Sequence, residues 1–331
     1  MTSYLLVGLT VILALLFDFI NGFHDTANAI ATAVSTKALS PKHAIITASC
    51  MNFLGAVLFT GVAKTIAKDI VDVASIPNLT VVIIAALISS IAWNLITWYF
   101  GIPSSSSHAL IGSIAGAAIV AAGIGCINLN GFLNIIKSLI ISPILALVVG
   151  YIMFTIFKYL FKNLNLSKAN RRFRRIQVVT AAIQSFAHGT NDAQKSMGII
   201  SMALVSCGLA ESGSIPFWVQ VSCAAAMALG TSIGGWRIIK TVGTQIMKIR
   251  PVSGVAADLS SAIIIFGASK IGLPVSTTHV ISSSIMGVGS AYRFKGVNWD
   301  TGKRMVVTWF ITLPISAAIS AIVFSIIRII L

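Results

Sequence analysis

Long apolar segments alternate with short polar connections along almost the whole chain. They fall roughly at 4–36, 43–63, 79–100, 108–125 and 132–160, and again at 176–200, 202–233, 255–272, 275–292 and 304–330. A helix needs about 20 mostly apolar residues to cross a bilayer. The pattern therefore predicts an all-α polytopic membrane protein with about 10–12 membrane segments.

Two kinds of polar cluster interrupt the apolar segments, and each kind occurs once in either half. "FINGFHDTANAIA" (19–31) aligns with "FAHGTNDAQKSMG" (186–198), and "GIPSSSSH" (101–108) aligns with "GLPVSTTH" (272–279). The offsets are 167 residues (192 − 25) and 171 residues (279 − 108), which indicates a duplication. An odd number of spans in each half would turn the second copy upside down, as in many secondary transporters built from inverted-topology repeats with broken helices or re-entrant half-helices.

The boundary between the repeats is expected at a basic linker. Residues 162–175 hold six basic residues and no acid, so we expect repeat 1 over 1–161, a cytoplasmic linker, and repeat 2 over 176–331. With five spans before this linker, the positive-inside rule predicts that both termini lie outside.

Composition narrows the class of protein further. The 331 residues are 56% hydrophobic and only 9% charged, and the mean hydropathy is +0.95. The net charge of +15 comes from basic residues in short loops, which is typical of a membrane protein rather than of a nucleic-acid-binding one. The four cysteines are isolated in apolar sequence and predict no disulfide framework. The N-terminus has no basic n-region and does not resemble a cleaved signal peptide.

The first kind of cluster places Asp25 and Asp192 inside apolar segments. An intramembrane carboxylate is costly, which favours a functional site over an acid that is paired only for packing. Gly22 and Gly189 precede the acids and are expected to let the helix unwind. Carboxylates, amide oxygens and free carbonyls bind hard cations, so the predicted ligands of Na⁺ or carriers of a coupling proton are Asp25, Asn28, Asn191 and Asp192.

The second kind of cluster follows Pro103 and Pro274. A proline followed by hydroxyl residues and an apolar run predicts a helix N-terminus. Helix N-termini and hydroxyls both bind anions, although serines in membrane helices also bond to their own helix. The predicted anion ligands are Ser105, Ser106 and Ser107 in one copy and Ser276, Thr277 and Thr278 in the other. The roles of His24, His108 and His279 stay open between proton carrier and structural donor.

An anion flanked by two carboxylates is repelled unless cations or protons bind with it. The two kinds of cluster together therefore predict symport of an anion with Na⁺ or H⁺. Gln194 and Lys195 are included in the predicted substrate site because they occupy the place of Ala27 and Asn28 in the other copy. Lys195 lies three residues after Asp192, so it would either pair with that carboxylate or contact the anion, and we favour the contact.

These motifs resemble those of the inorganic phosphate transporter (PiT) family over essentially the whole chain. "GFHDTANAIATAVSTKALSP" and "HGTNDAQKSMGII" look like its two signature copies, and "PSSSSHALIG" and "PVSTTHVISSS" look like its paired hydroxyl motifs. His24 stands where the family more often has Asn, and Gln194-Lys195 resembles the compact bacterial and archaeal branch. The resemblance implies an inverted-repeat homodimer that carries phosphate across the cell membrane with Na⁺ or H⁺, with the acid–amide pairs and hydroxyls above as site residues.

Three alternatives remain beside a phosphate symporter. A sulfate permease of the same family is the nearest. An anion channel is less favoured, because a pore needs no matched sites of compensating charge. An enzyme is not expected, since adjacent residues such as Ser107 and His108 point about 100° apart on a helix and no third oriented group is evident. No cofactor and no nucleic-acid partner are expected, and the lipid bilayer is the expected surroundings.

Overall fold

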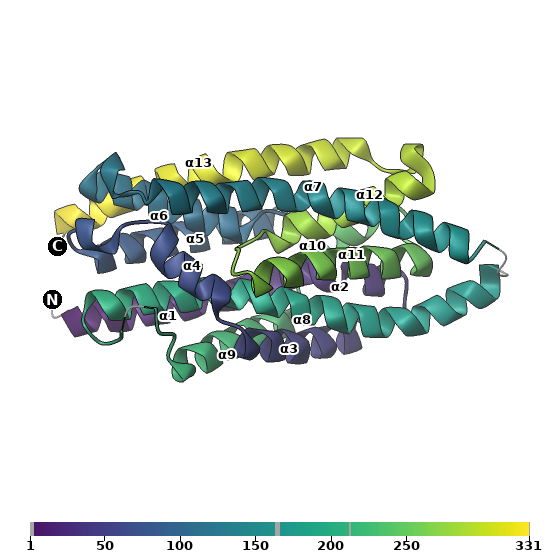
Figure 1. Ribbon diagram of the computed structural model, residues 1–331, viewed down its shortest axis with the longest axis horizontal. Helices are drawn as coiled ribbons and strands as arrows, with labels where there is room; N and C mark the ends of the chain where they lie inside the picture. The colour runs from purple at the N-terminus through teal and green to yellow at the C-terminus, as the bar shows by residue number, and fades with distance from the viewer. Residues whose placement is uncertain (1–2, 163–165, 212, 331) are drawn as a thin grey trace.

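The computed structural model describes residues 3–162, 166–211 and 213–330, and in this part of the chain it is helical with only two isolated β-bridges, Val71–Ile127 and Met247–Val297. Most of the long helices run roughly along one direction and form an elongated bundle, which α4 crosses obliquely (Figure 1). They are α1 (Ser3–His24), α2 (Thr26–Ser35), α3 (Pro41–Leu58), α4 (Gly61–Asp69), α5 (Leu79–Tyr99), α6 (Ser106–Ala122), α7 (Leu129–Leu160), α8 (Leu166–Ser206), α9 (Phe217–Ile233), α10 (Trp236–Lys240), α11 (Pro251–Lys270), α12 (Thr277–Arg293) and α13 (Trp299–Ile330), with short helical turns at η1 (Val73–Ser75), η2 (Ile124–Cys126), η3 (Thr241–Gln245) and η4 (Phe294–Gly296).

The second half repeats the element order of the first. The pair α3–α4 is bent by 65°, and its counterpart Phe217–Ile233 with Trp236–Gln245 is bent by 67°. The short helices α6 and α12 both have 17 residues, and the long helices α7 and α13 both have 32 and contain a proline, Pro143 or Pro314. The apolar pattern therefore predicted the element order well, and the matching breaks support the duplication.

Helices of one half pack closely against helices of the other half. α7 packs against α12, and α13 packs against α6. A Cβ on Gly116 would meet the Ala317 carbonyl of α13, and one on Gly287 would meet the Leu147 carbonyl of α7. Small residues allow membrane helices to pack backbone to backbone. The repeats proposed from the sequence are thus not separate packing units, because each covers part of the other.

Within the described residues, five helical stretches are long and apolar enough to cross a membrane, or seven if each bent pair counts as one span. α6, at 17 residues, is apolar but shorter than these spans. α8 and α12 lie inside the bundle and carry the polar residues of the two motifs. The chain is a multi-pass membrane protein with broken helices, as predicted.

The predicted linker differs from the structure. α8 begins at Leu166, so most of the segment 162–175 is helical rather than a loop. Phe173 is buried against Val255, whereas Arg171, Arg172, Arg174 and Arg175 are exposed. Arginine is a good helix former, and one apolar residue docked on α11 gives the first turns of α8 a buried face. The apolar segment expected over 202–233 also differs, because α8 continues to Ser206 and α9 begins only at Phe217.

The unwinding expected at Gly22 and Gly189 is wrong. α1 continues through Gly22 to His24, and α8 runs unbroken through Gly189. A Cβ on Gly22 would meet the Met227 carbonyl of α9, and one on Gly189 would meet the Asn52 carbonyl of α3. Both glycines therefore permit close helix packing. The one break lies at Asp25, between α1 and α2.

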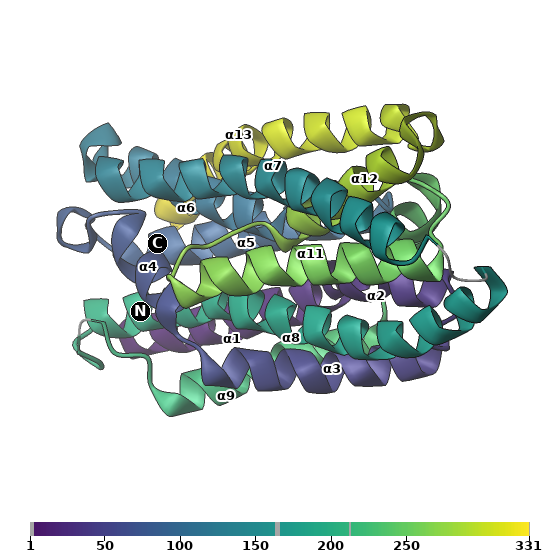
Figure 2. The same cartoon turned by 45° about the vertical axis from the view of Figure 1, so that its right-hand side comes forward.

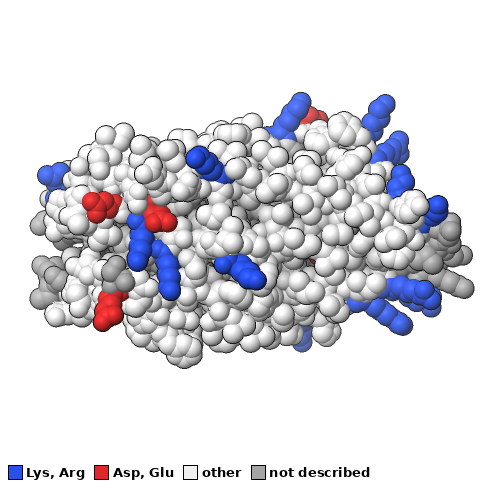
Figure 3. Space-filling view, in the orientation of Figure 1, with Lys and Arg blue, Asp and Glu red and all other residues white. Residues whose placement is uncertain are grey.

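The two ends of the bundle differ in charge. Figures 1 and 2 show both termini at one end and the α7–α8 connection at the other. Lysines and arginines gather at the end with the α7–α8 connection, whereas the acidic residues visible on this face lie mostly toward the end with the termini (Figure 3). One end of the bundle is therefore strongly basic, and the other end carries both acidic and basic residues. The positive-inside rule predicts such a difference between the two ends of a membrane protein.

Candidate functional site

The two hydroxyl motifs form the N-termini of α6 and α12, as predicted. Ser105 caps α6 and accepts from the His108 amide at 3.1 Å, and Ser276 caps α12 and accepts from the His279 amide at 3.3 Å. The prolines before them keep the preceding residues extended. All the motif residues from Ser104 to His108 and from Ser276 to His279 are buried. The site therefore contains two helix N-termini inside the bundle.

Asp25 lies at the α1–α2 break and is 1% exposed. Ser106 Oγ donates to its Oδ2 at 2.5 Å, and Thr278 Oγ1 donates to its Oδ1 at 3.0 Å. His24 Nδ1 lies 2.6 Å from the same Oδ1. Asn28 Nδ2 in turn donates to Thr278 Oγ1 at 2.9 Å. One carboxylate thus joins the first turns of both short helices.

Asp192 lies on α8 and is fully buried. Lys195 Nζ donates to its Oδ1 at 2.6 Å, and Thr277 Oγ1 donates to its Oδ2 at 2.9 Å. His188 Nε2 lies 3.1 Å from Oδ2. The ammonium of Lys195 is itself only 1% exposed, so the pair is an internal one. Asp192 therefore has a permanent positive partner, whereas the described side chains that contact the Asp25 carboxylate are a histidine and two hydroxyls.

Ser107 joins the two hydroxyl motifs, and Asn191 joins α8 to the segment before α12. Ser107 Oγ donates to the Val275 carbonyl at 2.9 Å, and the Val275 amide donates to Asn191 Oδ1 at 3.2 Å. The first bond holds the two helix N-termini together, and the second ties the start of α12 to α8. Gln194 points elsewhere: its Oε1 accepts from the Ala63 amide of α4 at 3.1 Å, and its Nε2 donates to the Thr190 carbonyl at 2.5 Å. Its place in the substrate site stays a prediction.

The two motif histidines stack beside the site. The rings of His108 and His279 have centroids 4.6 Å apart, and His279 stacks on Trp309 of α13 at 4.1 Å. His108 Nδ1 lies 2.8 Å from Ser105 Oγ. These contacts support a positioning role at the helix starts.

Two further buried acids were missed from the sequence. Asp18 of α1 is fully buried and accepts from Ser196 Oγ at 2.7 Å. Asp258 of α11 is 2% exposed and accepts from Thr32 Oγ1 at 2.6 Å and Thr180 Oγ1 at 3.0 Å. Both lie in predicted apolar segments, so the rule applied to Asp25 would have found them. The comparison of repeats hid them, because the matched positions hold Ser185 and Leu87.

Residues 21–167 and 162–320 match the phosphate transporter family. The chain belongs to this family. It is 67% identical over 327 residues to a probable low-affinity inorganic phosphate transporter of Bacillus subtilis, covering 98% of each chain. It is 29% identical over 383 residues to a putative phosphate permease of Thermococcus kodakarensis, covering 93% of this chain and 94% of that one. A solved structure named "The sodium-dependent phosphate transporter" superposes with a TM-score of 0.88 at 28% identity, covering 98% of this chain and 100% of that one.

Membership in the phosphate transporter family decides the class of protein. The chain is a transporter and not an enzyme, and it is a phosphate transporter of the membrane. The resemblance read from the four motifs is confirmed, including its bacterial and archaeal relatives. The sulfate alternative receives no support from these relatives.

Proposed function

We propose that this chain carries inorganic phosphate by symport with Na⁺ or H⁺ at the site around Asp25 and Asp192. The observation that supports this most directly is the meeting of two buried carboxylates with two helix N-termini drawn from both halves of the chain. Free N–H groups and hydroxyls at a helix start bind phosphate oxygens. The carboxylates are acceptors, and they repel the same anion.

That repulsion is the basis of the proposed coupling. Among the ion pairs of the described residues, only Lys195 brings a permanent positive charge to the two acids. A multiply charged phosphate therefore needs further positive charge to enter. Na⁺ on Asp25, Asn28, Asn191 and Asp192, or protons on the acids and histidines, would supply it. The solved relative is named as sodium-dependent, which supports Na⁺ for that protein and makes it the first ion to test here.

Uptake of labelled phosphate into liposomes containing the purified protein tests this function. Na⁺ and pH gradients are imposed separately. Accumulation above equilibrium under one gradient, and its collapse when that gradient is dissipated, is the expected result. Phosphate flux that only equilibrates under every gradient would indicate a channel and contradict the proposal.

The matched elements further support inverted repeats and alternating access. An odd number of spans before the α7–α8 connection would place the second half upside down relative to the first. Rocking of one half against the other would then open the site to either end. The homodimer implied by the family resemblance also stays a prediction, which the mass of the purified protein in detergent tests.

On this arrangement the basic end faces the cytoplasm and both termini face outside. In a variant without native cysteines, Lys162→Cys at the end of α7 is expected to resist an impermeant thiol reagent applied to intact cells. Gly125→Cys, in exposed η2 at the opposite end of α7, is the matched control and should react. Labelling of Lys162→Cys from outside would overturn the orientation.

Removing the hydroxyls should weaken phosphate binding without ending it. Each hydrogen bond to a charged group is worth about 1.5–3 kcal/mol. Alanine at Ser105, Ser106 and Ser107 together, or at Ser276, Thr277 and Thr278 together, is expected to lower phosphate affinity more than about tenfold. Backbone N–H donors keep some affinity. Calorimetry that finds both triple variants as tight as wild type would remove these residues from the site.

Lys195 is expected to contact phosphate when the anion enters, although it pairs with Asp192 at 2.6 Å in this structure. Lys195→Met should then raise the half-saturating phosphate concentration by about tenfold or more, the value of one charged hydrogen bond. If the lysine serves only as a partner of Asp192, its loss leaves that carboxylate prone to protonation. Phosphate affinity would then change little and the pH profile of transport would move instead, which would contradict the contact.

A further inference from the structure

A third polar group lies on α1 before Asp25. Asp18 and Asn21 are separated by one helical turn and share a face of α1. Both are fully buried, and so is Asn94 of α5. Neither asparagine nor Asp18 contacts the hydroxyl motifs through a hydrogen bond among the described residues. The group therefore needs an explanation separate from the Asp25 and Asp192 sites.

The register of α1 and α5 places Asn21 and Asn94 at the same level of the bundle. His24 Nε2 of α1 lies 3.0 Å from Thr97 Oγ1 of α5. The helices run in the same direction, since Leu6 and Val81, near their starts, line one cavity. Asn21 and Asn94 each precede the His24–Thr97 pair by three residues. They therefore stand one turn before it on two packed helices, and both side chains are fully buried.

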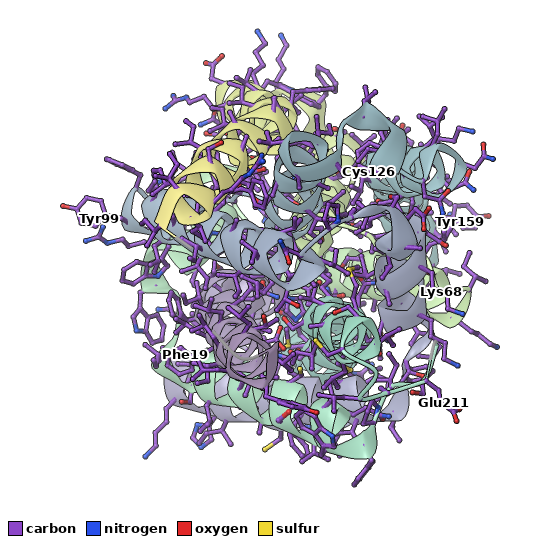
Figure 4. The ribbon with its side chains drawn as sticks, turned by 90° about the vertical axis from the view of Figure 1, so that its left-hand side faces the viewer. Phe19, Lys68, Tyr99, Cys126, Tyr159 and Glu211 are labelled. Atoms are coloured by element: carbon purple, nitrogen blue, oxygen red, sulfur yellow. The ribbon has the colours of Figure 1, made fainter. Side chains whose placement is uncertain are left out.

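α8 closes this group from the other side. α1 packs against both α5 and α8, and α5 also packs against α8. Ser196 Oγ of α8 donates to Asp18 Oδ1 at 2.7 Å, which aims Asp18 toward α8. Figure 4 looks along the bundle from the end with the termini and shows α1, marked by Phe19, beside α8. Asn21 lies between the directions of Asp18 and His24 on the α1 surface, so it points into the seam of the three helices.

The polar atoms in this seam are unsatisfied. Both side-chain polar atoms of Asn21 and of Asn94 have no hydrogen-bond partner in the described part of the chain, and neither has Asp18 Oδ2. Burying an amide without a partner costs about 1–3 kcal/mol. Burying five unpaired polar atoms this close together costs too much free energy for these three side chains to serve only in packing. Three of the five atoms are oxygens, Asp18 Oδ2 and the Oδ1 atoms of Asn21 and Asn94, and oxygens of this kind can coordinate a cation.

The carboxyl group of Asp18 favours a positively charged ligand. Among the described residues, no lysine, arginine or histidine lies within ion-pair distance of Asp18, and Lys195 is occupied by Asp192. A buried carboxylate without a positive partner is strongly unfavourable until it binds a cation or a proton. Asp18 Oδ2 and the amide oxygens of Asn21 and Asn94 are hard donors that suit a small cation.

We propose that Asp18, Asn21 and Asn94 bind one Na⁺, at a site separate from Asp25 and Asp192. The site lies between the phosphate site and the end of the bundle that carries the termini. An ion from that end would reach it before the phosphate site. Its positive charge would lower the repulsion that phosphate meets at Asp25. This role rests on the proposed cation coupling, whereas the binding itself does not.

Equilibrium binding of radioactive Na⁺ to the purified protein, without phosphate and without a gradient, tests the site. The wild type is expected to bind Na⁺, and the double variant Asn21→Leu with Asn94→Leu is expected to bind one Na⁺ fewer per chain. Ser90→Ala is the matched control on α5, because its hydroxyl donates only to the Ala86 carbonyl of its own helix, at 2.7 Å. It should bind as the wild type does.

A gain-of-affinity variant guards against a double variant that fails to fold. Asn94→Asp adds a charged oxygen to the ligand set and should tighten Na⁺ binding about tenfold at pH 8, since ligand charge sets the affinity of such sites. The proposal is overturned if Asn94→Asp leaves Na⁺ affinity unchanged, if the double variant binds as many ions as wild type, or if the wild type binds none. Phosphate uptake, measured separately, shows whether the proposed function stands in each case.

Discussion

Asp25→Asn and Asp192→Asn are each expected to abolish coupled phosphate uptake while the protein still folds. The amide has nearly the volume of the carboxylate but none of its charge. It cannot hold a coupling cation or proton in the same way, and each charge-assisted hydrogen bond that it loses is worth about 1.5–3 kcal/mol. Asp25 accepts hydrogen bonds from Ser106 and Thr278, and the amide oxygen of Asn can still accept one of them, so the fold should survive although the charge is gone.

Uptake into liposomes under the coupling gradient is the measurement, with protein amount and monodispersity checked for each variant. Asp300→Asn is the matched control, because this carboxylate is exposed at the start of α13. It should transport like wild type. Accumulation of phosphate by both site variants at the wild-type rate would remove the acids from the coupling site.

Gly230→Leu is expected to prevent assembly of the bundle. Gly230 lies on α9 where its backbone meets the Phe19 carbonyl of α1, so even a Cβ has no room. Overpacking of this kind costs about 1–3 kcal/mol for a few extra methylenes, and more where the obstacle is backbone. Because α9 holds α1 in place, the loss also displaces Asp25. The yield of monodisperse protein in detergent and its unfolding temperature measure the effect.

Gly267→Leu is the control for that substitution. Gly267 is also helical, on the exposed side of α11, and a Cβ there meets nothing within 4 Å. Leucine favours the helix over glycine by about 0.8–1.0 kcal/mol, so this variant should be as stable as wild type or slightly more so. Equal yields and unfolding temperatures for the two leucine variants would show that the α1–α9 approach is not as tight as described.

Much of the fold and part of the site could be predicted from the sequence, because the patterns that mark them involve only neighbouring residues. A run of about 20 apolar residues marks a span whatever it packs against. Pro103 with its serines and Pro274 with its hydroxyls predict helix starts from neighbouring residues alone, and the caps at Ser105 and Ser276 confirm them. Asp25 and Asp192 could be found because each is a charge within such a run. These signals, with their two matched copies, were enough to identify a phosphate transporter.

The roles of single residues could not be predicted in the same way. Glycine beside an acid fits both an unwound turn and a close helix contact, and only the position of α9 and α3 shows that Gly22 and Gly189 serve the second. Gln194 occupies a motif position, yet its amide bonds to α4 and to its own helix. Asp18 was passed over because its repeat counterpart is a serine.

The sequence by itself determined the membrane class, the duplication, the helix starts and the two central acids, since apolar runs, charges and caps are properties of neighbouring residues. Only the tertiary structure decided which groups share a site. Thr278 reaches Asp25 across the two repeats, Ser107 reaches Val275, and His24 reaches Thr97. Such pairings depend on the rotation and register of packed helices, and a shift of one residue turns a side chain by about 100° to another neighbour. No pattern along the chain records that rotation.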